Sequence, residues 1–386
     1  SVLLSQMARS QLAPYETNRP VIGGQFFGRK TQVNRVLTNP NTNFLFIGIR
    51  RIGKTSLLKE IKRVMDEEDP PRSGETRRLY VDCTVISSEE EFLRTLTADL
   101  APSEMKLLMG RAAQAKRYKR LMFDRFADLN GGPVTILIDE LDRLLSEIDD
   151  PNSLFDVLRA AFIAGKARFI MAGFRKAMSA VTNVNSPFNN FATDVVIGKL
   201  KASEVERMIL GPMGSLRVSF ESQQLVNRIA HETSGLPNYV QFYCQTLLEI
   251  LDEEERSEIR EADIDKVYES REFRNFVIDN FTSNTVPLER ALVYCVIAEF
   301  KDRPTIPPFT QRTIDGFLRK RNLTLNYREL EWACRNLHVS GVFENSGLEY
   351  IFSVPLFHRI LLQTRDVDFL FEKTKAELYS DNNFRV

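Results

Sequence analysis

The segment with the clearest chemical capability is a glycine-bounded run that carries a lysine and a hydroxyl. Residues 48–56 read G-I-R-R-I-G-K-T-S and match the pattern G-x-x-x-x-G-K-[S/T]. In such a loop the glycines let the backbone wrap a triphosphate, so that successive N–H groups point at its oxygens. The lysine reaches the outer phosphates, and the hydroxyl after it ligates Mg²⁺. The pattern therefore predicts a phosphate-binding P-loop.

This run supplies most of the predicted contacts to a nucleotide. Lys54 is expected to hold the outer phosphates and to act in catalysis, and Thr55 is expected to ligate the metal ion. The side chains of Arg50 and Arg51 are expected to face outward, toward a partner subunit or a carboxylate, while their backbone cradles phosphate. The predicted contacts are Gly48, Ile49, Arg50, Arg51, Ile52, Gly53, Lys54, Thr55 and Ser56.

A group of acids follows a second apolar run. Residues 134–142 read V-T-I-L-I-D-E-L-D, which fits a strand buried on both faces with acids at its carboxyl end, where open α/β sheets bind ligands. Asp139 is expected to hold Mg²⁺ through water, and Glu140 to orient and deprotonate the water that attacks the γ-phosphate. For Asp142 two roles stay open, assisting this chemistry or pointing to solvent. A strand that ends in an ordinary charged turn is the alternative for the whole segment.

A cation follows the next predicted strand, which ends in M-A-G-F-R-K at residues 171–176. A positive side chain at this place lies beside the γ-phosphate and senses its presence. Arg175 is therefore the candidate sensor and the third predicted catalytic residue, with an ordinary surface arginine as the alternative.

The elements that position these residues follow from the periodicity of the chain. From about residue 21 to residue 200, short apolar runs alternate with helical patterns, which is typical of a doubly wound α/β domain with a mainly parallel sheet. A strand directly before the glycine run and a helix directly after it argue against the alternative of a glycine-rich turn with a surface lysine. The predicted strands are residues 44–48, 78–84, 134–139, 167–174 and 194–197.

The pattern changes after residue 200. Helical spacing at residues 203–210, 222–232, 238–251 and 262–272, with no strand between them, predicts a compact helical subdomain, and the charged run 252–258 reads as a solvated helix end. Helices at residues 288–300, 311–320 and 327–338, followed by a hairpin around Asn345-Ser346-Gly347, give the outline of a winged helix. The predicted domains are an N-terminal arm (1–20), a P-loop α/β domain (21–200), a helical lid (201–285), a winged-helix domain (286–365) and a C-terminal tail (366–386).

The overall composition excludes several classes of protein. The 52 Lys+Arg balance 52 Asp+Glu, which argues against a surface tuned as a whole to nucleic acid or anionic membrane. Four separated cysteines and three histidines offer no structural zinc site and predict free thiols in a cytoplasmic protein. No apolar stretch approaches the ~20 residues of a membrane helix. The sequence starts at Ser1 with neither a signal-peptide pattern nor a methionine, which leaves open that it is a piece of a longer protein.

In their order along roughly residues 20–365, these signals resemble the STAND and origin-recognition branch of the AAA+ P-loop ATPases. The resemblance includes Phe26-Phe27-Gly28-Arg29 before the P-loop, Ser186-Pro187-Phe188 after the acidic strand, and Thr233-Ser234-Gly235-Leu236-Pro237. It implies that ATP or ADP binds with Mg²⁺, that Phe27, Gly28 and Arg29 pack over the adenine, and that Pro237 begins a lid helix and touches the base. Without the upstream motifs, Gly235 to Pro237 would read as an ordinary turn between helices.

The sequence departs from this family pattern at two places. Lys30 replaces the acid that usually follows Phe-Gly-Arg, so a contact that needs that acid is in doubt. Ser353 stands where many STAND proteins carry a histidine that binds ADP, and His358, one turn further on, reads as a surface residue. The sequence therefore does not support a histidine latch on ADP.

Charge alone does not assign the predicted winged helix to DNA. Between Glu299 and His338 there are eight Lys/Arg against five Asp/Glu, including Arg319-Lys320-Arg321, while the hairpin tip at Glu344 is acidic. A further basic stretch, residues 106–120, reads as an amphipathic helix. We therefore favour an internal clamp that moves on activation over a DNA-reading module.

The leading hypothesis is a slow, regulatory, Mg²⁺-dependent ATPase that acts as a STAND-like switch. Its nucleotide state would control domain rearrangement and self-assembly or an attached effector. The alternative is an initiator or transposition-regulator ATPase whose winged helix binds duplex DNA. A nucleotide-dependent scaffold with negligible hydrolysis is the third reading.

Overall fold

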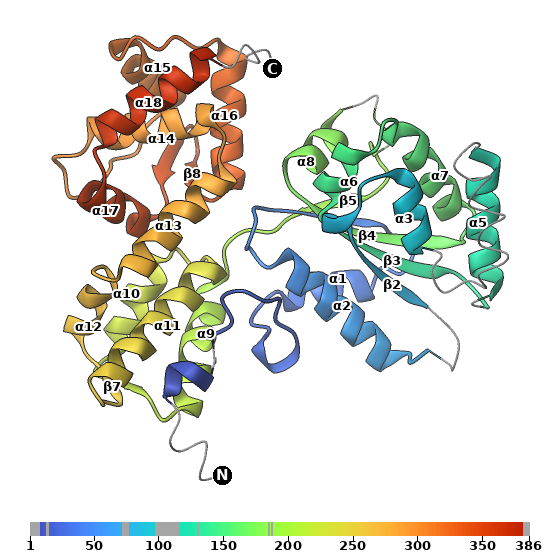
Figure 1. Ribbon diagram of the computed structural model, residues 1–386, viewed down its shortest axis with the longest axis horizontal. Helices are drawn as coiled ribbons and strands as arrows, with labels where there is room; N and C mark the ends of the chain where they lie inside the picture. Colours follow the sequence, from blue (N-terminus) through green and yellow to red (C-terminus); the bar gives the residue numbers. More distant parts are fainter. Residues whose placement is uncertain are drawn as a thin grey trace. The chain divides into compact units, whose positions relative to one another are not determined.

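The computed structural model describes residues 8–12, 15–71, 77–96, 116–129, 131–183, 186 and 188–380. The chain forms two compact units, both drawn in Figure 1. One unit is Pro20–Ile197, and the other combines Gly198–Val386 with the N-terminal segment Ser1–Arg19.

The first unit is built on a five-stranded sheet in which all pairs are parallel, in the order β2-β3-β4-β1-β5. The central strands are fully or almost fully buried, as their continuous apolar runs predict. The predicted strands are confirmed to within a residue or two, and the largest difference is at Cys83–Val85, which form the 3₁₀ turn η3. The strands are β1 Phe44–Ile47, β2 Arg78–Asp82, β3 Val134–Asp139, β4 Ala167–Gly173 and β5 Thr193–Val196.

Helices cover both faces of this sheet (Figure 1). Two helices, α1 (Lys30–Leu37) and α2 (Lys54–Glu68), pack together on one face. The helices that follow β2, β3 and β4 lie on the other face, because parallel strands are joined by right-handed crossovers. These are α3 Glu89–Leu96, α5 Lys116–Leu129, α6 Leu141–Glu147, α7 Pro151–Ile163 and α8 Arg175–Thr182. Most of the basic stretch 106–120 lies outside the described residues.

The strand order locates the switch point of the sheet. From β1 the chain passes through α2 to β2 at one edge, whereas from the neighbouring β4 it passes through α8 to β5 at the other edge. Open α/β sheets bind their ligands at the carboxyl ends of two such diverging strands. The loop of residues 48–53 leaves β1 at this place.

The second unit contains the predicted helical subdomain, but the prediction that it lacks strands is wrong. Ser219–Phe220 (β6) and Glu258–Ile259 (β7) pair in parallel. The charged run 252–258 is likewise more than a solvated helix end, because it leads into β7 and its Arg256 binds Asp263 at 2.7 Å. The helices are α9 Ala202–Ser215, α10 Gln223–Glu232, α11 Pro237–Glu253, α12 Glu261–Val267 and α13 Arg271–Asn284.

The N-terminal segment is attached to this helical subdomain. Its 3₁₀ turn η1 (Arg9–Leu12) contacts α11, and the backbone N–H of Ser10 donates to Asp252 at 2.8 Å. The Tyr15 hydroxyl donates to the carbonyl of Ile209 at 2.6 Å. The predicted arm is therefore held by α9 and α11 before the chain enters the first unit.

The C-terminal part has the predicted order of three helices and an antiparallel hairpin. The hairpin turn falls at Gly347-Leu348, where Gly347 has a φ of +67°, one residue later than predicted. The predicted tail is largely helical, because α18 packs along α14 and buries Phe371 and Leu378. The elements are α14 Pro287–Glu299, α15 Gln311–Lys320, α16 Tyr327–Val339, β8 Phe343–Ser346, β9 Glu349–Phe352, α17 Pro355–Thr364 and α18 Val367–Ser380.

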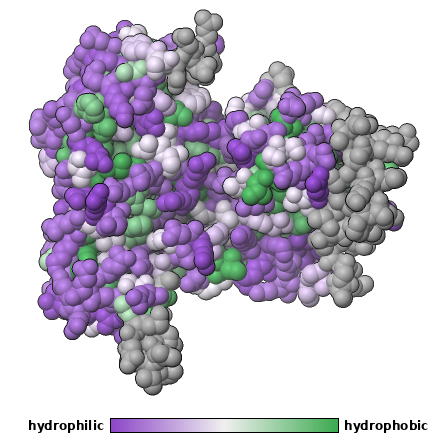
Figure 2. Space-filling view, in the orientation of Figure 1, coloured by the Kyte–Doolittle hydropathy of each residue, from purple (hydrophilic) through white to green (hydrophobic). Residues whose placement is uncertain are grey.

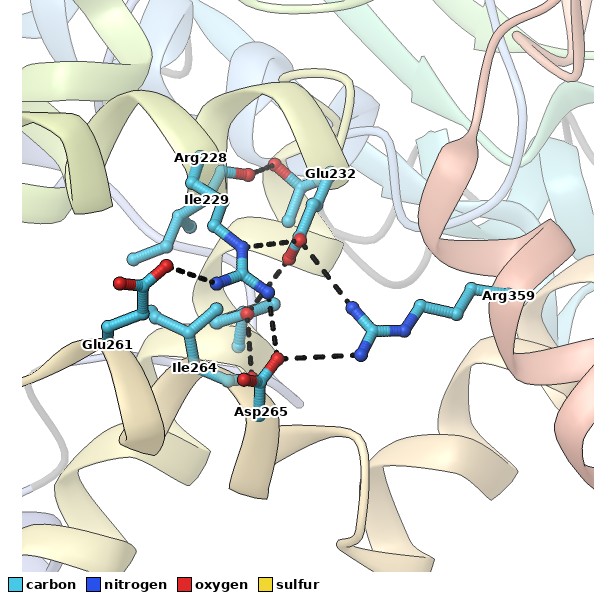
Figure 3. A network of polar contacts seen from close by, with 9 residues as sticks. Arg228, Ile229, Glu232, Glu261, Ile264, Asp265 and Arg359 are labelled. Atoms are coloured by element: carbon cyan, nitrogen blue, oxygen red, sulfur yellow. Dashed lines mark hydrogen bonds and ion pairs between the residues drawn. The ribbon is translucent and has the colours of Figure 1, made fainter. Parts of the chain in front are cut away.

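An ion-pair network joins α17 to the helical subdomain (Figure 3). Arg228 on α10 binds Glu232 at 3.0 Å and Asp265 of α12 at 2.8 Å. Arg359 of α17 approaches the same two carboxylates at 4.0 and 3.4 Å, and its guanidinium lies 3.9 Å from the ring centre of Tyr268. The two arginines therefore share two acids, and this sharing fastens α17 to α10 and α12.

The described surface is mainly polar on the face that Figure 2 shows. On the face shown in Figure 2, most of the described surface is hydrophilic and the hydrophobic residues form small, separate groups. Among the helices that the structure describes, none has the length and apolar character needed to cross a membrane.

Candidate nucleotide-binding site

The loop between β1 and α2 depends on its two glycines for different reasons. Gly53 has a φ of +97°, in the left-handed region that a side chain disfavours. Gly48 has no such conformation, but a Cβ there would lie 2.9 Å from the carbonyl oxygen of Ile197. Arg51 also adopts a left-handed backbone, with φ of +64°. The sequence therefore folds into a tight turn whose backbone bends twice.

Lys54 is the first residue of α2, and its side chain folds back over this loop. Its Nζ donates to the carbonyl oxygens of Gly48 and Ile49, both at 2.9 Å, and the residue is only 5% exposed. Burial lowers the pKa of Lys54, while the carboxylates of Glu140 and Asp139 favour its charged form. The ammonium is thus held at the mouth of the loop, close to the acids of β3.

The other side chains of the loop divide into two groups. Ile49 and Ile52 are buried at 4% and 1% exposure, and they anchor the loop to the core. Arg50 and Arg51 are exposed. Arg50 also lowers the pKa of Glu140 by its charge, so it lies within electrostatic range of a carboxylate, one of the two expected surroundings.

The segment before the Phe-Gly-Arg motif is fixed to α2. Ser56 Oγ accepts a hydrogen bond from the backbone N–H of Val21 at 3.1 Å, and Glu60 accepts from that of Gly23 at 2.8 Å. Glu60 also pairs with Arg63 at 2.8 Å, and this arginine holds the pKa of Glu60 below its usual range. Sequence reasoning missed Glu60, because nothing in a helical sequence reveals a partner on a distant loop.

The Phe-Gly-Arg motif makes a sharp turn in the same unit. Gly28 and Arg29 both have positive φ values, +75° and +59°, and α1 begins directly after them. Arg29 is buried and Phe27 is half-buried. Their contact with adenine stays a prediction.

Asp139 is buried at the carboxyl end of β3 and held at both oxygens. Tyr80 of β2 donates its hydroxyl to Oδ2 at 2.7 Å, and the backbone N–H of Glu140 donates to Oδ1 at 2.9 Å. Burial, together with the charge of Asp139, raises the pKa of Tyr80, so the phenol remains a donor. Sequence reasoning did not find Tyr80, whose role appears only when β2 and β3 pair.

The donors at this edge fit a magnesium ion that arrives with a triphosphate. Mg²⁺ keeps several waters and takes one or two protein oxygens, with the phosphates supplying the rest. Asp139 and the Thr55 hydroxyl are such oxygens, and each Asp139 oxygen keeps a lone pair beyond its hydrogen bond. Within the ranges that the structure describes, His, Cys, Asp and Glu do not gather in threes into a separate metal site.

Glu140 follows in a left-handed backbone conformation, with φ of +50° and ψ of +47°. For a residue with a side chain, this region costs of order 1 kcal/mol or more, and it recurs at functional sites. Burial raises the pKa of Glu140, and Lys54 opposes this effect. A carboxylate with a raised pKa is a better general base near neutral pH than an ordinary one.

Asp142 does not point to solvent. Its Oδ1 accepts from the backbone N–H of Lys176 at 2.6 Å, and its Oδ2 accepts from that of Phe174. Arg175 lies between these two residues as the first residue of α8, half-buried, with its guanidinium 4.8 Å from the ring centre of Phe174. The candidate sensor is thus at the carboxyl end of β4, and its contact with a phosphate stays a prediction.

Pro237 belongs to the second unit, unlike the other candidates. It is the first residue of α11, as predicted, and it follows Gly235, which has a φ of +66°. The Gly235 carbonyl accepts from the N–H of Leu200 at 2.9 Å. A Cβ at Gly235 would lie 3.1 Å from Leu200 O, so this turn packs closely on the segment that enters the unit.

Ser353 and His358, the two residues considered for the place of the family's histidine latch, are both buried. The Ser234 hydroxyl donates to the carbonyl of Ser353, and the Ser353 hydroxyl donates to that of Gly341. The prediction that His358 is a surface residue is wrong, because it is 9% exposed and burial lowers its pKa. In the Ser186-Pro187-Phe188 loop, Pro187 lies outside the described residues.

A parallel sheet of this strand order, with a lysine-bearing glycine loop after β1 and acids after β3, defines a P-loop NTPase. The family model of Novel STAND NTPase 1 matches residues 12–269, and the chain belongs to this family. The resemblance drawn from the motifs is therefore confirmed. No curated protein matches the chain.

Solved structures show the same fold over almost the whole chain. The Walker-type ATPase of Pyrococcus abyssi superposes with a TM-score of 0.64 at 13% identity, covering 90% of this chain and 99% of that one. The ORC2 protein of Aeropyrum pernix in its ADPNP–ADP complexes gives a TM-score of 0.63 at 15% identity, covering 93% and 98%. Its ADP form gives 0.52 at 14% identity, with the same coverage. At these identities the likeness shows the fold alone.

Proposed function

We propose that the chain binds ATP with Mg²⁺ at the P-loop, hydrolyses it slowly, and uses its nucleotide state as a switch. One observation carries the proposal. The buried ammonium of Lys54, which bonds the loop carbonyls, is electrostatically coupled to Glu140 and Asp139 at the same edge of the sheet. This is the charge arrangement that phosphoryl transfer requires.

Each group then has a defined task. The N–H groups of the loop and the Lys54 ammonium bind the β- and γ-phosphates. Thr55 and Asp139 would hold the metal ion, which would supply positive charge against the charge that builds on these phosphates. Glu140 orients the attacking water and takes its proton, a role that its raised pKa favours. Arg175 is our proposed sensor of the γ-phosphate.

Adenine nucleotides are the proposed ligands. The Aeropyrum pernix ORC2 protein, which has the same fold, is named as a complex with ADPNP and ADP. The half-buried Phe27, beside the turn at Gly28 and Arg29, offers an apolar surface for the base. Pro237 would contact the same base from the start of α11.

The contacts inside the second unit support a clamp. Arg359 fastens α17 to the acids of α10 and α12, and Lys199 binds Glu344 of the hairpin at 2.7 Å. Ser234, next to the turn at Gly235, bonds Ser353 after the hairpin. A movement of the Gly235 turn on nucleotide exchange would therefore displace the winged-helix region through this contact. The displaced region would then control self-assembly or an effector.

The described part of the basic cluster at Arg319, Lys320 and Arg321 does not favour the DNA-binding alternative. Each residue of its basic cluster pairs with an acid, so less charge is free for phosphates. The pairs are Arg319 with Asp315 at 2.8 Å, Lys320 with Glu299 at 3.6 Å, and Arg321 with Asp368 at 2.6 Å. The DNA-binding alternative makes two testable predictions. The affinity for duplex DNA should fall steeply with salt, and it should fall again when these three residues are neutralised.

Turnover by three variants tests the proposal. K54A should abolish hydrolysis, and E140Q should abolish it while ATP binding persists. K62A, on the solvent face of α2 where Lys62 pairs with Asp66, is the matched control and should hydrolyse ATP normally. Hydrolysis by K54A at the wild-type rate would refute the assignment.

A further inference from the structure

The carboxylate of Asp142 makes contacts that the proposed chemistry does not use. It is the second residue of α6 and lies two residues after Glu140. Its two oxygens accept from the backbone N–H groups of Phe174 and Lys176. Asp142 therefore reaches from the end of β3 to the turn that joins β4 to α8.

At this turn α8 has no cap of its own. Its N-cap residue is Phe174, whose side chain offers no acceptor, and the first N–H groups of a helix lack partners within it. Asp142 supplies from another element what Ser, Asn or Asp supplies at an ordinary N-cap. Its negative charge also interacts favourably with the positive end of α8.

The approach of Asp142 requires the glycine that ends β4. A Cβ at Gly173 would lie 2.7 Å from Asp142 Oδ2 and 2.6 Å from the Cβ of Ala177. Real Cβ atoms do not come so close to other atoms, so any side chain at Gly173 would displace the carboxylate or the helix. The hydrogen bond from Phe174 to Asp142 therefore depends on the absence of a side chain at Gly173.

The contact of Asp142 with the β4–α8 turn lies between two proposed site residues, Glu140 and Arg175. Glu140 immediately precedes α6, and Arg175 lies between the two residues whose N–H groups Asp142 binds. Anchoring the first turn of α6 to the first turn of α8 fixes the path of both. The two hydrogen bonds of Asp142 therefore tie the segment that carries Glu140 to the turn that carries Arg175.

We propose that Asp142 is a positioning residue that keeps the base Glu140 and the sensor Arg175 in register around the γ-phosphate. This inference rests on the proposed function, because it assumes ATP at the P-loop. Without the link, ATP would still bind to the loop and Lys54. Arg175 would contact the γ-phosphate less well, and the attack of water on the γ-phosphate would become slower.

A cap that only stabilises the fold is the competing explanation, and the chain offers a matched control for it. Asp150 caps α7 in the same unit by accepting from the N–H of Ser153 at 3.1 Å, and it is exposed. Removing either carboxylate costs one helix cap. Only the removal of Asp142 also breaks the tie between the start of α6 and the turn that joins β4 to α8.

The experiment compares D142N and D142A with D150N and D150A. Three quantities are measured: kcat, KM for ATP, and the ratio of the dissociation constants for ADP and a non-hydrolysable ATP analogue. The Asp142 variants should lose about tenfold to hundredfold in kcat, as expected for misplaced reacting groups, with a much smaller rise in KM that reflects the weaker contact to the γ-phosphate. The affinity ratio should move toward one. The Asp150 variants should stay close to wild type in all three quantities.

A double variant separates positioning from a general loss of structure. If Asp142 acts through Arg175, D142N should cost much less in an R175A background than in wild type. If D142A does not fold, D142N and G173A, which displaces the carboxylate from the other side, decide the matter. D142N with the kcat and affinity ratio of D150N, or additive effects with R175A, overturns the inference alone. A wild-type chain that binds no ATP overturns the proposed function and this inference together.

Discussion

The hydroxyl of Tyr80 donates to Oδ2 of Asp139 across two neighbouring strands, at 2.7 Å. Asp82 and Asp139 are register partners at the ends of the same two strands. The phenol therefore fixes the orientation of the one buried carboxylate that is proposed to serve the metal ion, and it keeps that carboxylate satisfied inside the protein.

We predict that Y80F weakens the binding of Mg²⁺-ATP by about tenfold, the equivalent of one hydrogen bond to a charged group. Binding of ATP without Mg²⁺ should change little, because the Tyr80 hydroxyl donates to the metal-side carboxylate. Calorimetric titration with and without Mg²⁺ measures both. Y243F is the control, since Tyr243 makes a similar bond to Glu232 at 3.0 Å in the second unit. An equal loss in the two variants would contradict a role for Tyr80 at the metal.

The pH dependence of turnover follows from two shifted groups. The pKa of Glu140 is raised, so this base gains its proton, and kcat falls, at a higher pH than for a glutamate with the ordinary value of 4.5. The pKa of Lys54 is lowered, so its charge, and with it phosphate binding, is lost at a lower pH than the ordinary 10.5. We expect a bell-shaped profile, measured as kcat and kcat/KM against pH. A kcat that stays flat down to pH about 4.5 would exclude Glu140 as the base.

A second pH effect concerns stability. Arg63 holds the pKa of Glu60 below its ordinary value, so the contribution of Glu60 is present above that value and disappears as the pH falls through the lowered one. E60Q should reduce the free energy of unfolding by about 1–2 kcal/mol at neutral pH and by less at an acidic pH where Glu60 is protonated in the folded protein. Urea denaturation at the two pH values measures the difference. E67Q, which removes the exposed second partner of Arg63, should have little effect at either pH.

The network in Figure 3 predicts where the second unit opens first. R359A removes the guanidinium that two acids and Tyr268 share, at a cost of about 1 kcal/mol, since the side chain is 39% exposed. Hydrogen exchange should become faster in α17 and stay unchanged in α2. K301A, which removes a surface pair with Asp368, is the control and should leave α17 protected. Unchanged exchange in α17 of R359A would show that the network does not hold it.

Much of the first unit could be predicted from the sequence, because its signals are local. The strands before residues 48 and 140 are continuous apolar runs, and the glycine loop has a fixed spacing. The remainder depends on partners far apart in the chain. Asp142 bonds amides on another strand, Tyr80 bonds Asp139, and the two-residue strands β6 and β7 exist only because their segments meet. Local periodicity holds no information about such contacts.

The wrong prediction for His358 has the same origin. The sequence predicts His358 at the surface because polar side chains are usually exposed. In the structure it lies on the buried face of α17. The segment after residue 366 carries a mixture of charged and apolar residues without a clear period, and α14 provides the surface that makes it helical.

The most direct test of the account is an equilibrium titration of the wild-type chain, K54A and E140Q with Mg²⁺-ATP. We predict saturable binding of one nucleotide to the wild type and to E140Q. K54A should show no measurable binding, because the buried ammonium is the only proposed cation on the outer phosphates within the loop. Binding of equal strength to all three proteins, or to none of them, would contradict the claim that this loop and these acids form a nucleotide site.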